Sequence, residues 1–247
     1  MTESGPDGLL AGRTPVDIPL APQAAGLVFG DRLPMAAAYV RLLADTGTSH
    51  GLIGPREVPR LWDRHVLNCA VVAELIPPGA TVFDIGSGAG LPGLALAVAR
   101  PDLTIHLIEP LARRVRWLEA AVAELGLDGV TIHCRRAEDL GGDARADVVT
   151  ARAVASLSVL ARWSMPLLPP GGRLLALKGA KAEDELGEAR STLRALGATE
   201  SSVRVCGAGV LEVPTRVIEV VAGTTVRKSG EHRRRRPTGK GGRHQAT

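Results

Sequence analysis

The stretch from Thr81 to Gly93 constrains the fold of this chain more than any other. It reads Thr-Val-Phe-Asp-Ile-Gly-Ser-Gly-Ala-Gly-Leu-Pro-Gly, and an apolar, alanine-rich segment follows at 94–99. This order predicts a buried strand, a tight turn and a helix. Gly86 and Gly88 permit positive φ angles and let a ligand come close to the backbone. The helix start behind them offers unpaired N–H groups to a nucleotide-like ligand.

The glycine pattern fits two kinds of cofactor. Residues 88–93 satisfy G-x-G-x-x-G, the pattern of dinucleotide-binding proteins. Asp84, two residues before Gly86, extends the pattern to D-x-G-x-G-x-G, which favours S-adenosylmethionine. We therefore predict that Asp84, Gly86 and Gly88 contribute to a site for S-adenosylmethionine, with a nicotinamide-dependent oxidoreductase as the alternative from another class.

Strand and helix patterns alternate after residue 80, and the chain of 247 residues fits one α/β domain with additions. The last two predicted strands are joined by a short glycine-containing connection, so we expect them to pair antiparallel. The fold class is thus α/β, a mostly parallel seven-stranded sheet with a terminal antiparallel hairpin. The predicted strands are 81–85, 104–109, 130–134, 147–151, 173–178, 202–206 and 213–221, and the helices between them are 91–100, 111–125, 156–167 and 182–196.

Four regions follow from these patterns. Residues 1–30 are rich in Pro, Gly and Ala and are predicted to be disordered. Residues 31–79 are predicted to form a helical cap from two helices, 31–44 and 57–75. Residues 80–222 form the predicted cofactor-binding domain, and 223–247 a basic, disordered tail.

The positive charge of the chain belongs to its tail. Residues 227–247 contain eight Lys and Arg residues and one Glu, a net charge of +7, whereas the whole chain carries +4. The preceding residues therefore carry −3. A block of like charges is typical of an interaction tail for nucleic acid, although a tail that only aids solubility has the same composition.

Ligands of such sheets bind at the carboxyl ends of the strands, so the residues at those ends are the candidates for function. Glu109 follows the second strand and is expected to accept hydrogen bonds from ribose hydroxyls. Glu138 or Asp139, together with the backbone of Ala137, follows the third strand and is a candidate for the adenine edge. Arg152 and Lys178 end the fourth and fifth strands, as candidates for holding RNA or cofactor.

Several kinds of chemistry lack their usual residues here. No His, Cys and carboxylate cluster has metal-ligand spacing, and Cys69, Cys134 and Cys206 lie far apart in apolar surroundings typical of buried thiols. No segment is long and apolar enough to predict a membrane helix. Asn68 is the only Asn, so the Asn-Pro-Pro motif of amine methylation is absent. We expect no metal, no membrane contact and a cytoplasmic monomer.

The motifs together resemble one known family. They are Trp62-Asp-Arg-His65-Val-Leu-Asn, the stretch 82–94, Arg113-Arg-Val-Arg-Trp-Leu118, Ala137-Glu-Asp, Ala151-Arg-Ala-Val-Ala-Ser-Leu157 and Leu177-Lys-Gly179. In this order they resemble the bacterial 16S ribosomal RNA guanine-N7 methyltransferases, the glucose-inhibited division protein B family. The resemblance covers roughly residues 31–222.

The resemblance implies a class I methyltransferase fold, S-adenosylmethionine as methyl donor and one guanine of the small ribosomal subunit RNA as substrate. By position it implies cofactor contacts at Gly86, Leu91, Ala137, Glu138 and Arg152. Arg64 and His65 of the cap are then candidates for lining the substrate mouth. A small-molecule methyltransferase of the same fold is the closer alternative. Guanine N7 carries no proton, so no catalytic base is assigned.

Overall fold

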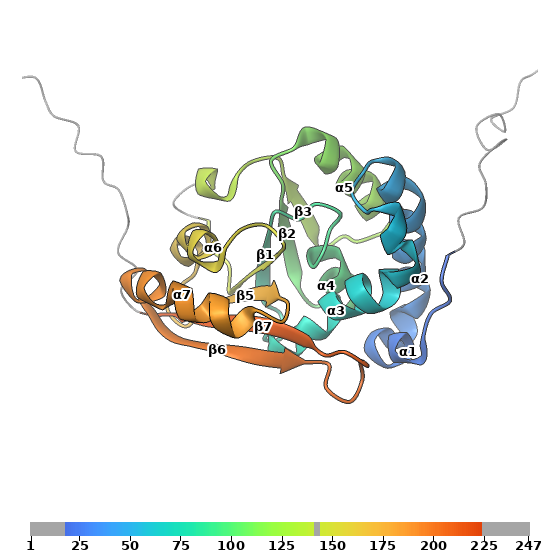
Figure 1. The fold of residues 1–247 in the computed structure, drawn as a ribbon. Helices are drawn as coiled ribbons and strands as arrows, with labels where there is room; N and C mark the ends of the chain where they lie inside the picture. Colours follow the sequence, from blue (N-terminus) through green and yellow to red (C-terminus); the bar gives the residue numbers. More distant parts are fainter. Residues whose placement is uncertain (1–17, 141–143, 224–247) are drawn as a thin grey trace, which may run out of the picture.

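The protein is described by a computed structural model that covers residues 18–140 and 144–223, and its centre is one seven-stranded sheet (Figure 1). The strands are β1 (Thr81–Ile85), β2 (Thr104–Ile108), β3 (Val130–His133), β4 (Val148–Arg152), β5 (Arg173–Lys178), β6 (Ala198–Cys206) and β7 (Thr215–Ala222). They lie in the order β3-β2-β1-β4-β5-β7-β6. The neighbours from β3 to β5 pair parallel, and β7 pairs antiparallel with both β5 and β6.

The predicted sheet is therefore confirmed, including its terminal antiparallel hairpin. The chain runs from β1 outward to β3 and then returns to place β4 on the other side of β1, so β1 and β4 are neighbours at the switch point. The loops after these two strands diverge, and their separation leaves room for a ligand at the carboxyl ends.

Helices cover both faces of the sheet. They are α4 (Gly93–Ala99), α5 (Ala112–Leu125), α6 (Leu157–Ser164) and α7 (Ala182–Ala195), with 3₁₀ turns η7 (Ala137–Asp139) and η8 (Met165–Leu167). One core contains side chains of α4, α5 and the N-terminal helices packed on residues such as Val82 and Ile105. The second core packs α6 and α7 on the opposite face, where Phe83 and Ile85 point. The alternation of side chains along β1 explains this division.

The N-terminal cap is helical, as predicted, but irregular. Its segments are α1 (Gln23–Phe29), η2 (Gly30–Arg32), α2 (Leu33–Leu42), η3 (Leu43–Gly47), η4 (Pro55–Arg60), η5 (Leu61–Val66), α3 (Leu67–Ala70) and η6 (Val71–Leu75). The single helix predicted for 57–75 is wrong in detail, since 3₁₀ and π turns replace most of it. Pro59, which lacks an N–H group, lies inside η4 and disfavours a regular α-helix there.

The prediction of disorder for 1–30 is also wrong where the structure describes this region. Helix α1 occupies 23–29, with Ala25 and Phe29 buried. These two residues lie four apart and share one helix face, and the Phe29 ring meets Trp62 edge-to-face at 6.5 Å between centroids. Residues 1–17 and the predicted tail from 224 onward lie outside the described residues.

Candidate active site at the carboxyl edge of the sheet

The glycine turn after β1 passes close to the end of β4. Gly86 has a φ of +69° and donates its N–H to the Ile108 carbonyl oxygen at 2.8 Å, which continues the pairing of β1 with β2. A Cβ atom on Gly86 would lie 2.7 Å from a methyl carbon of Val154. Both the backbone angle and the contact therefore require glycine here.

Asp84 lies beneath this turn rather than in front of it. Its side chain is fully buried; Oδ2 accepts the Gly93 N–H at 3.0 Å and Oδ1 accepts the Thr150 hydroxyl at 3.4 Å. Burial raises the pKa of Asp84 to about 7, against the opposing effect of the hydrogen bond from Gly93. The carboxyl group thus joins β1, β4 and the start of α4, and it shapes the turn from below.

A cavity of about 360 Å³ opens in front of the turn. The ends of β1, β2 and β4, the start of α5, and η7 and α6 surround it. Its lining residues are Ile85, Gly86, Ile108, Glu109, Pro110, Leu111, Arg114, Arg136, Ala137, Glu138, Ala153, Val154 and Trp163. Four of the predicted cofactor residues, Gly86, Glu109, Ala137 and Glu138, thus meet in one cavity.

Glu109 is a buried charged residue of this cavity, with only 1% of its surface exposed. Oε2 accepts the Gly88 N–H at 3.0 Å, and Oε1 accepts the Leu111 N–H at 3.0 Å. Arg114 approaches the same carboxylate at 3.6 Å. Each carboxylate oxygen has a second lone pair, so Glu109 retains acceptor capacity for a hydroxyl-bearing ligand.

The other four predicted cofactor residues, which are Asp84 beneath the turn and Gly88, Leu91 and Arg152, do not line the cavity. Gly88 is linked to the cavity through its N–H group, which donates to the lining residue Glu109. Leu91 is 8% exposed and belongs to the core shared with the cap. The cap is fixed to this turn by Tyr39, whose hydroxyl donates to the Ala89 carbonyl oxygen at 2.7 Å. Burial raises the pKa of Tyr39 well above its usual value, which keeps that hydroxyl a donor.

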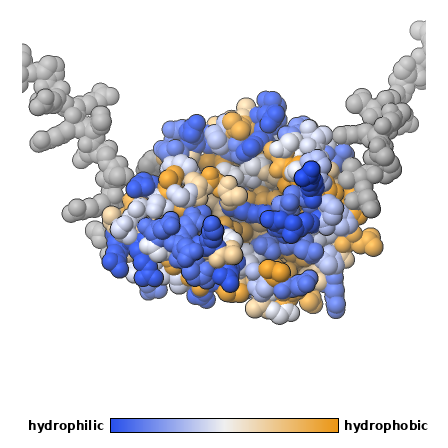
Figure 2. Space-filling model, viewed as in Figure 1, coloured by the Kyte–Doolittle hydropathy of each residue, from blue (hydrophilic) through white to orange (hydrophobic). Residues whose placement is uncertain are grey.

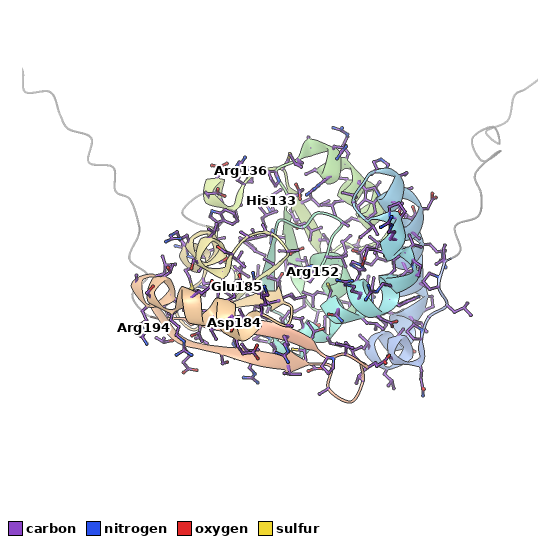
Figure 3. The ribbon with its side chains drawn as sticks, viewed as in Figure 1. His133, Arg136, Arg152, Asp184, Glu185 and Arg194 are labelled. Carbon is purple, nitrogen blue, oxygen red and sulfur yellow. The ribbon has the colours of Figure 1, made fainter. Side chains whose placement is uncertain are left out.

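Arg152 turns toward the cap, and Figure 3 places it between the sheet and the N-terminal helices. Its Nη2 donates to His65 Nδ1 at 2.9 Å and to the Arg64 carbonyl oxygen at 3.2 Å, while Nη1 approaches the Cys69 sulfur at 3.3 Å. Burial raises the pKa of the Cys69 thiol to about 11. Arg152 therefore joins the end of β4 to the cap.

His65 continues this connection outward. Its Nε2 lies 2.8 Å from Oε2 of Glu57. Because the Arg152 guanidinium only donates, Nδ1 must accept, and Nε2 then carries the proton donated to Glu57. Burial lowers the pKa of His65, partly opposed by its hydrogen bond to Glu57, so the neutral form is favoured. Glu57, His65 and Arg152 are called the cap clasp below.

Lys178 holds the same β4 loop from its other side. Its Nζ donates to the Ala155 carbonyl oxygen at 3.0 Å and to Glu185 Oε1 at 2.7 Å, and the same oxygen accepts the Leu157 N–H at 2.7 Å. Arg152 and Lys178 thus fix the two ends of segment 152–157, which carries Ala153 and Val154 into the cavity. Arg64, by contrast, keeps 54% of its side chain exposed beside Glu57.

Trp163, Leu111 and Arg114 also line the cavity, and the residue patterns did not single them out for it. Trp163 is half-buried on α6, and a lone Trp in a helical pattern is typical of core packing. Leu111 is 49% exposed and follows directly after Glu109 and Pro110. Its position two residues after Glu109, the predicted ribose contact, is the one sequence signal that places Leu111 at the cavity.

Three further predictions concern metal ligands, membrane helices and the burial of the thiols. Within 18–140 and 144–223, no group of His, Cys, Asp and Glu has the arrangement of a metal site. The same residues contain no helix long and apolar enough to cross a membrane. Cys69 and Cys206 are buried as expected, but the prediction for Cys134 is wrong because this thiol is exposed at the end of β3.

The fold is that of the class I methyltransferases. In agreement, the crystal structure of P. horikoshii TYW2 in complex with MeSAdo superposes with a TM-score of 0.53 at 15% sequence identity, covering 65% of this chain and 63% of that one. A likeness at this identity concerns the fold.

Sequence comparison gives the family. The profile of GidB, rRNA small subunit methyltransferase G, matches residues 32–214, and the chain belongs to this family of methyltransferases. Ribosomal RNA small subunit methyltransferase G of Renibacterium salmoninarum is 58% identical over 205 residues, covering 83% of this chain and 95% of the relative. The protein of the same name from Mycolicibacterium smegmatis is 54% identical over 205 residues, covering 82% and 87%.

Proposed function

We propose that this enzyme transfers a methyl group from S-adenosylmethionine to N7 of a single guanine in the 16S ribosomal RNA of the small subunit. The observation that carries the proposal is the family match over residues 32–214, within which the cavity residues all lie. A small-molecule substrate and a nicotinamide cofactor are both disfavoured by this membership. An rRNA substrate also supports a cytoplasmic location, and we retain the proposal of a monomer.

The cavity suits the proposed methyl donor. Glu109 has spare acceptor capacity for two ribose hydroxyls, and η7 presents the backbone of Ala137 and the side chain of Glu138 for an adenine edge. Apolar walls from Leu111, Val154 and Trp163 match the faces of a base. When bound, S-adenosylmethionine supplies the methyl group. Gly86 and the ordered turn would hold it without Cβ atoms in the way.

The protein's part in the reaction is positioning. Guanine N7 has a free lone pair and no proton to lose, so the chain need supply no general base. Holding two reactants in near-attack geometry contributes up to about 7–11 kcal/mol. We assign this role to the loop 152–157, whose ends are fixed by Arg152 and Lys178. Arg64 and His65 lie where this loop meets the cap, and exposed Arg64 is the candidate for direct contact with RNA.

The experiment is methyl transfer from labelled S-adenosylmethionine to small-subunit rRNA, offered both naked and as assembled particles, followed by mapping of the modified base. We expect 7-methylguanine at one position. Label at another atom or base would contradict the proposed reaction. If neither substrate is methylated while cofactor binding is intact, the alternative of a small-molecule methyltransferase would be favoured.

A further inference from the structure

A second cavity lies beside the first, on the outer side of α5. Its volume is about 250 Å³, and it is called the α5 groove here. The cap contributes one wall and α5 the other. Its lining residues are Leu42, Thr46, His50, Arg113, Arg116, Trp117, Ala120, Ala121 and Glu124. Since Leu111 and Arg114 line the cofactor cavity, the two cavities share the first turns of one helix.

The floor of the α5 groove is formed by a buried tryptophan that is hydrogen-bonded to the cap. Trp117 is 5% exposed, and its indole N–H donates to the Thr46 hydroxyl at 3.0 Å. This bond joins α5 to η3 of the cap across 71 positions of sequence. Just beyond η3, His50 Nδ1 lies 2.8 Å from the Thr46 carbonyl oxygen and must donate to it. Its Nε2 is then the ring nitrogen that remains for a ligand.

The rim of the groove carries two arginines at the start of α5, while Glu124 lines the groove farther along the same helix. Arg113 and Arg116 are both exposed, and neither has a carboxylate partner within 18–140 and 144–223. Several other arginines do have carboxylate partners. Arg100 meets Asp102, Arg216 meets Glu183, and Arg114, between the two groove residues, meets Glu109.

This placement opposes the stability of α5. The positive end of a helix dipole is its N-terminus, where acidic side chains are favourable and basic ones are not. The first turn of α5 contains no acid, and Arg113 and Arg116 form a like-charge pair at i, i+3. Helix α7 has the same length of 14 residues and follows the favourable pattern, with three acids in its first turn. Charges that oppose stability point to a ligand of opposite sign.

We propose that the α5 groove binds the phosphodiester backbone of the rRNA substrate, with Arg113 and Arg116 as its phosphate contacts. The inference rests on the proposed function and adds the surface on which the substrate docks. Arginine donates in a planar fork that suits phosphate oxygens. Residues from the first turns of α5 line both cavities, so backbone bound in the groove would hold a neighbouring nucleotide near the methyl donor.

The test is the double variant Arg113→Gln and Arg116→Gln, which keeps side-chain length and removes both charges. Its control is Arg190→Gln with Arg194→Gln on α7, two exposed arginines on the opposite face of the sheet without carboxylate partners in the described ranges. Figure 3 shows Arg194 far from the cap. Both variants and the wild type are compared for binding of small-subunit rRNA across a salt series, for KM and kcat of methyl transfer, and for S-adenosylmethionine affinity by calorimetry.

We expect the groove variant to raise KM for rRNA roughly tenfold near 0.1 M salt and to reduce the slope of log K against log salt by about 2. Cofactor affinity should not change, and the α7 control should match the wild type. A groove variant indistinguishable from the wild type, or an equal loss in the control, would overturn the inference. The inference would also be overturned if the groove variant lost binding only to assembled particles while the wild type also binds naked rRNA. The groove would then contact a ribosomal protein. A wild type that methylates no rRNA would instead overturn the proposed function.

Discussion

Glu109 accepts hydrogen bonds from the backbone and, in our proposal, also binds the cofactor. Its carboxylate accepts the N–H groups of Gly88 and Leu111, one on each oxygen, and so fixes the glycine turn relative to the end of β2. A carboxylate can do this with both oxygens because it has no donor atom. An amide of the same shape must turn an NH₂ group toward one of the two backbone N–H groups.

For this reason we expect Glu109→Gln to weaken S-adenosylmethionine binding by roughly 10- to 100-fold. This range corresponds to the loss of about 1.5–3 kcal/mol, the typical contribution of a hydrogen bond to a charged group. Isothermal calorimetry measures the effect, with Glu188→Gln on the exposed side of α7 as the matched control. An unchanged affinity in Glu109→Gln would remove this residue from the proposed ribose contacts.

The cap clasp links two segments that are far apart in the sequence. Glu57 lies in η4, His65 in η5 and Arg152 at the end of β4, and the imidazole is the middle member. Arg64 and Cys69 are the other charged or titratable groups beside it. A second proton on His65 would sit on Nδ1 and face the Arg152 donor. The clasp thus requires the neutral ring.

This requirement predicts a pH dependence of stability. Burial places the pKa of folded His65 below the ordinary value of 6.5, so the unfolded state takes up the proton first as pH falls. The stabilisation by His65 is therefore complete above about pH 6.5 and is lost as pH falls through the lower, folded pKa. His65→Phe should lose about 1–3 kcal/mol at pH 7.5 and less at pH 5. Urea unfolding of both proteins at the two pH values measures the difference, and a constant difference would contradict the assignment.

The sheet and its glycine turn were predictable because their patterns are local. The run from Val82 to Ile85 followed by glycines specifies a buried strand and a turn, and each of the five parallel strands was found within a residue or two of its predicted bounds. Strand β6 begins at Ala198, four residues before its predicted start at Ser202. Its exposed edge position removes the apolar alternation by which a strand is recognised.

The candidate site was predictable in part. Gly86, Glu109, Ala137 and Glu138 lie at strand ends, and the rule for parallel sheets brings strand ends together. Arg152 was expected to hold RNA or cofactor, but its direction depends on acceptors in Arg64 and His65, which lie 88 and 87 positions away. No local pattern contains that information. Trp163 reaches the cavity only because α6 packs beside η7, which is again a property of the tertiary arrangement.

Charge is distributed over the protein in two unequal parts. The described body presents a largely hydrophilic face with hydrophobic side chains visible toward its middle (Figure 2). Residues 227–247 lie outside the described part and carry a net +7, against −3 for the residues before them. Long-range attraction of a polyanion should therefore depend on the tail, while positioning should depend on the α5 groove.

Removal of residues 227–247 should weaken rRNA binding and flatten its salt dependence by more than the loss of two groove arginines, because eight cations are removed. Cofactor affinity should stay the same, since no residue of the cofactor cavity is deleted. Filter binding over a salt series compares the truncated and full-length chains. An unchanged slope would leave the tail without a part in RNA binding.

The arrangement of the three tryptophans has an optical consequence. Trp62 is 3% and Trp117 is 5% exposed, and their indole N–H groups are bonded to the Pro19 carbonyl oxygen and the Thr46 hydroxyl. Of the three, only Trp163 lines the cavity that we propose for the cofactor. A change of tryptophan emission on adding cofactor therefore belongs to Trp163, while the other two contribute a constant background. The protein carries its own fluorescent probe, and occupancy of the cavity can be followed in an unlabelled chain.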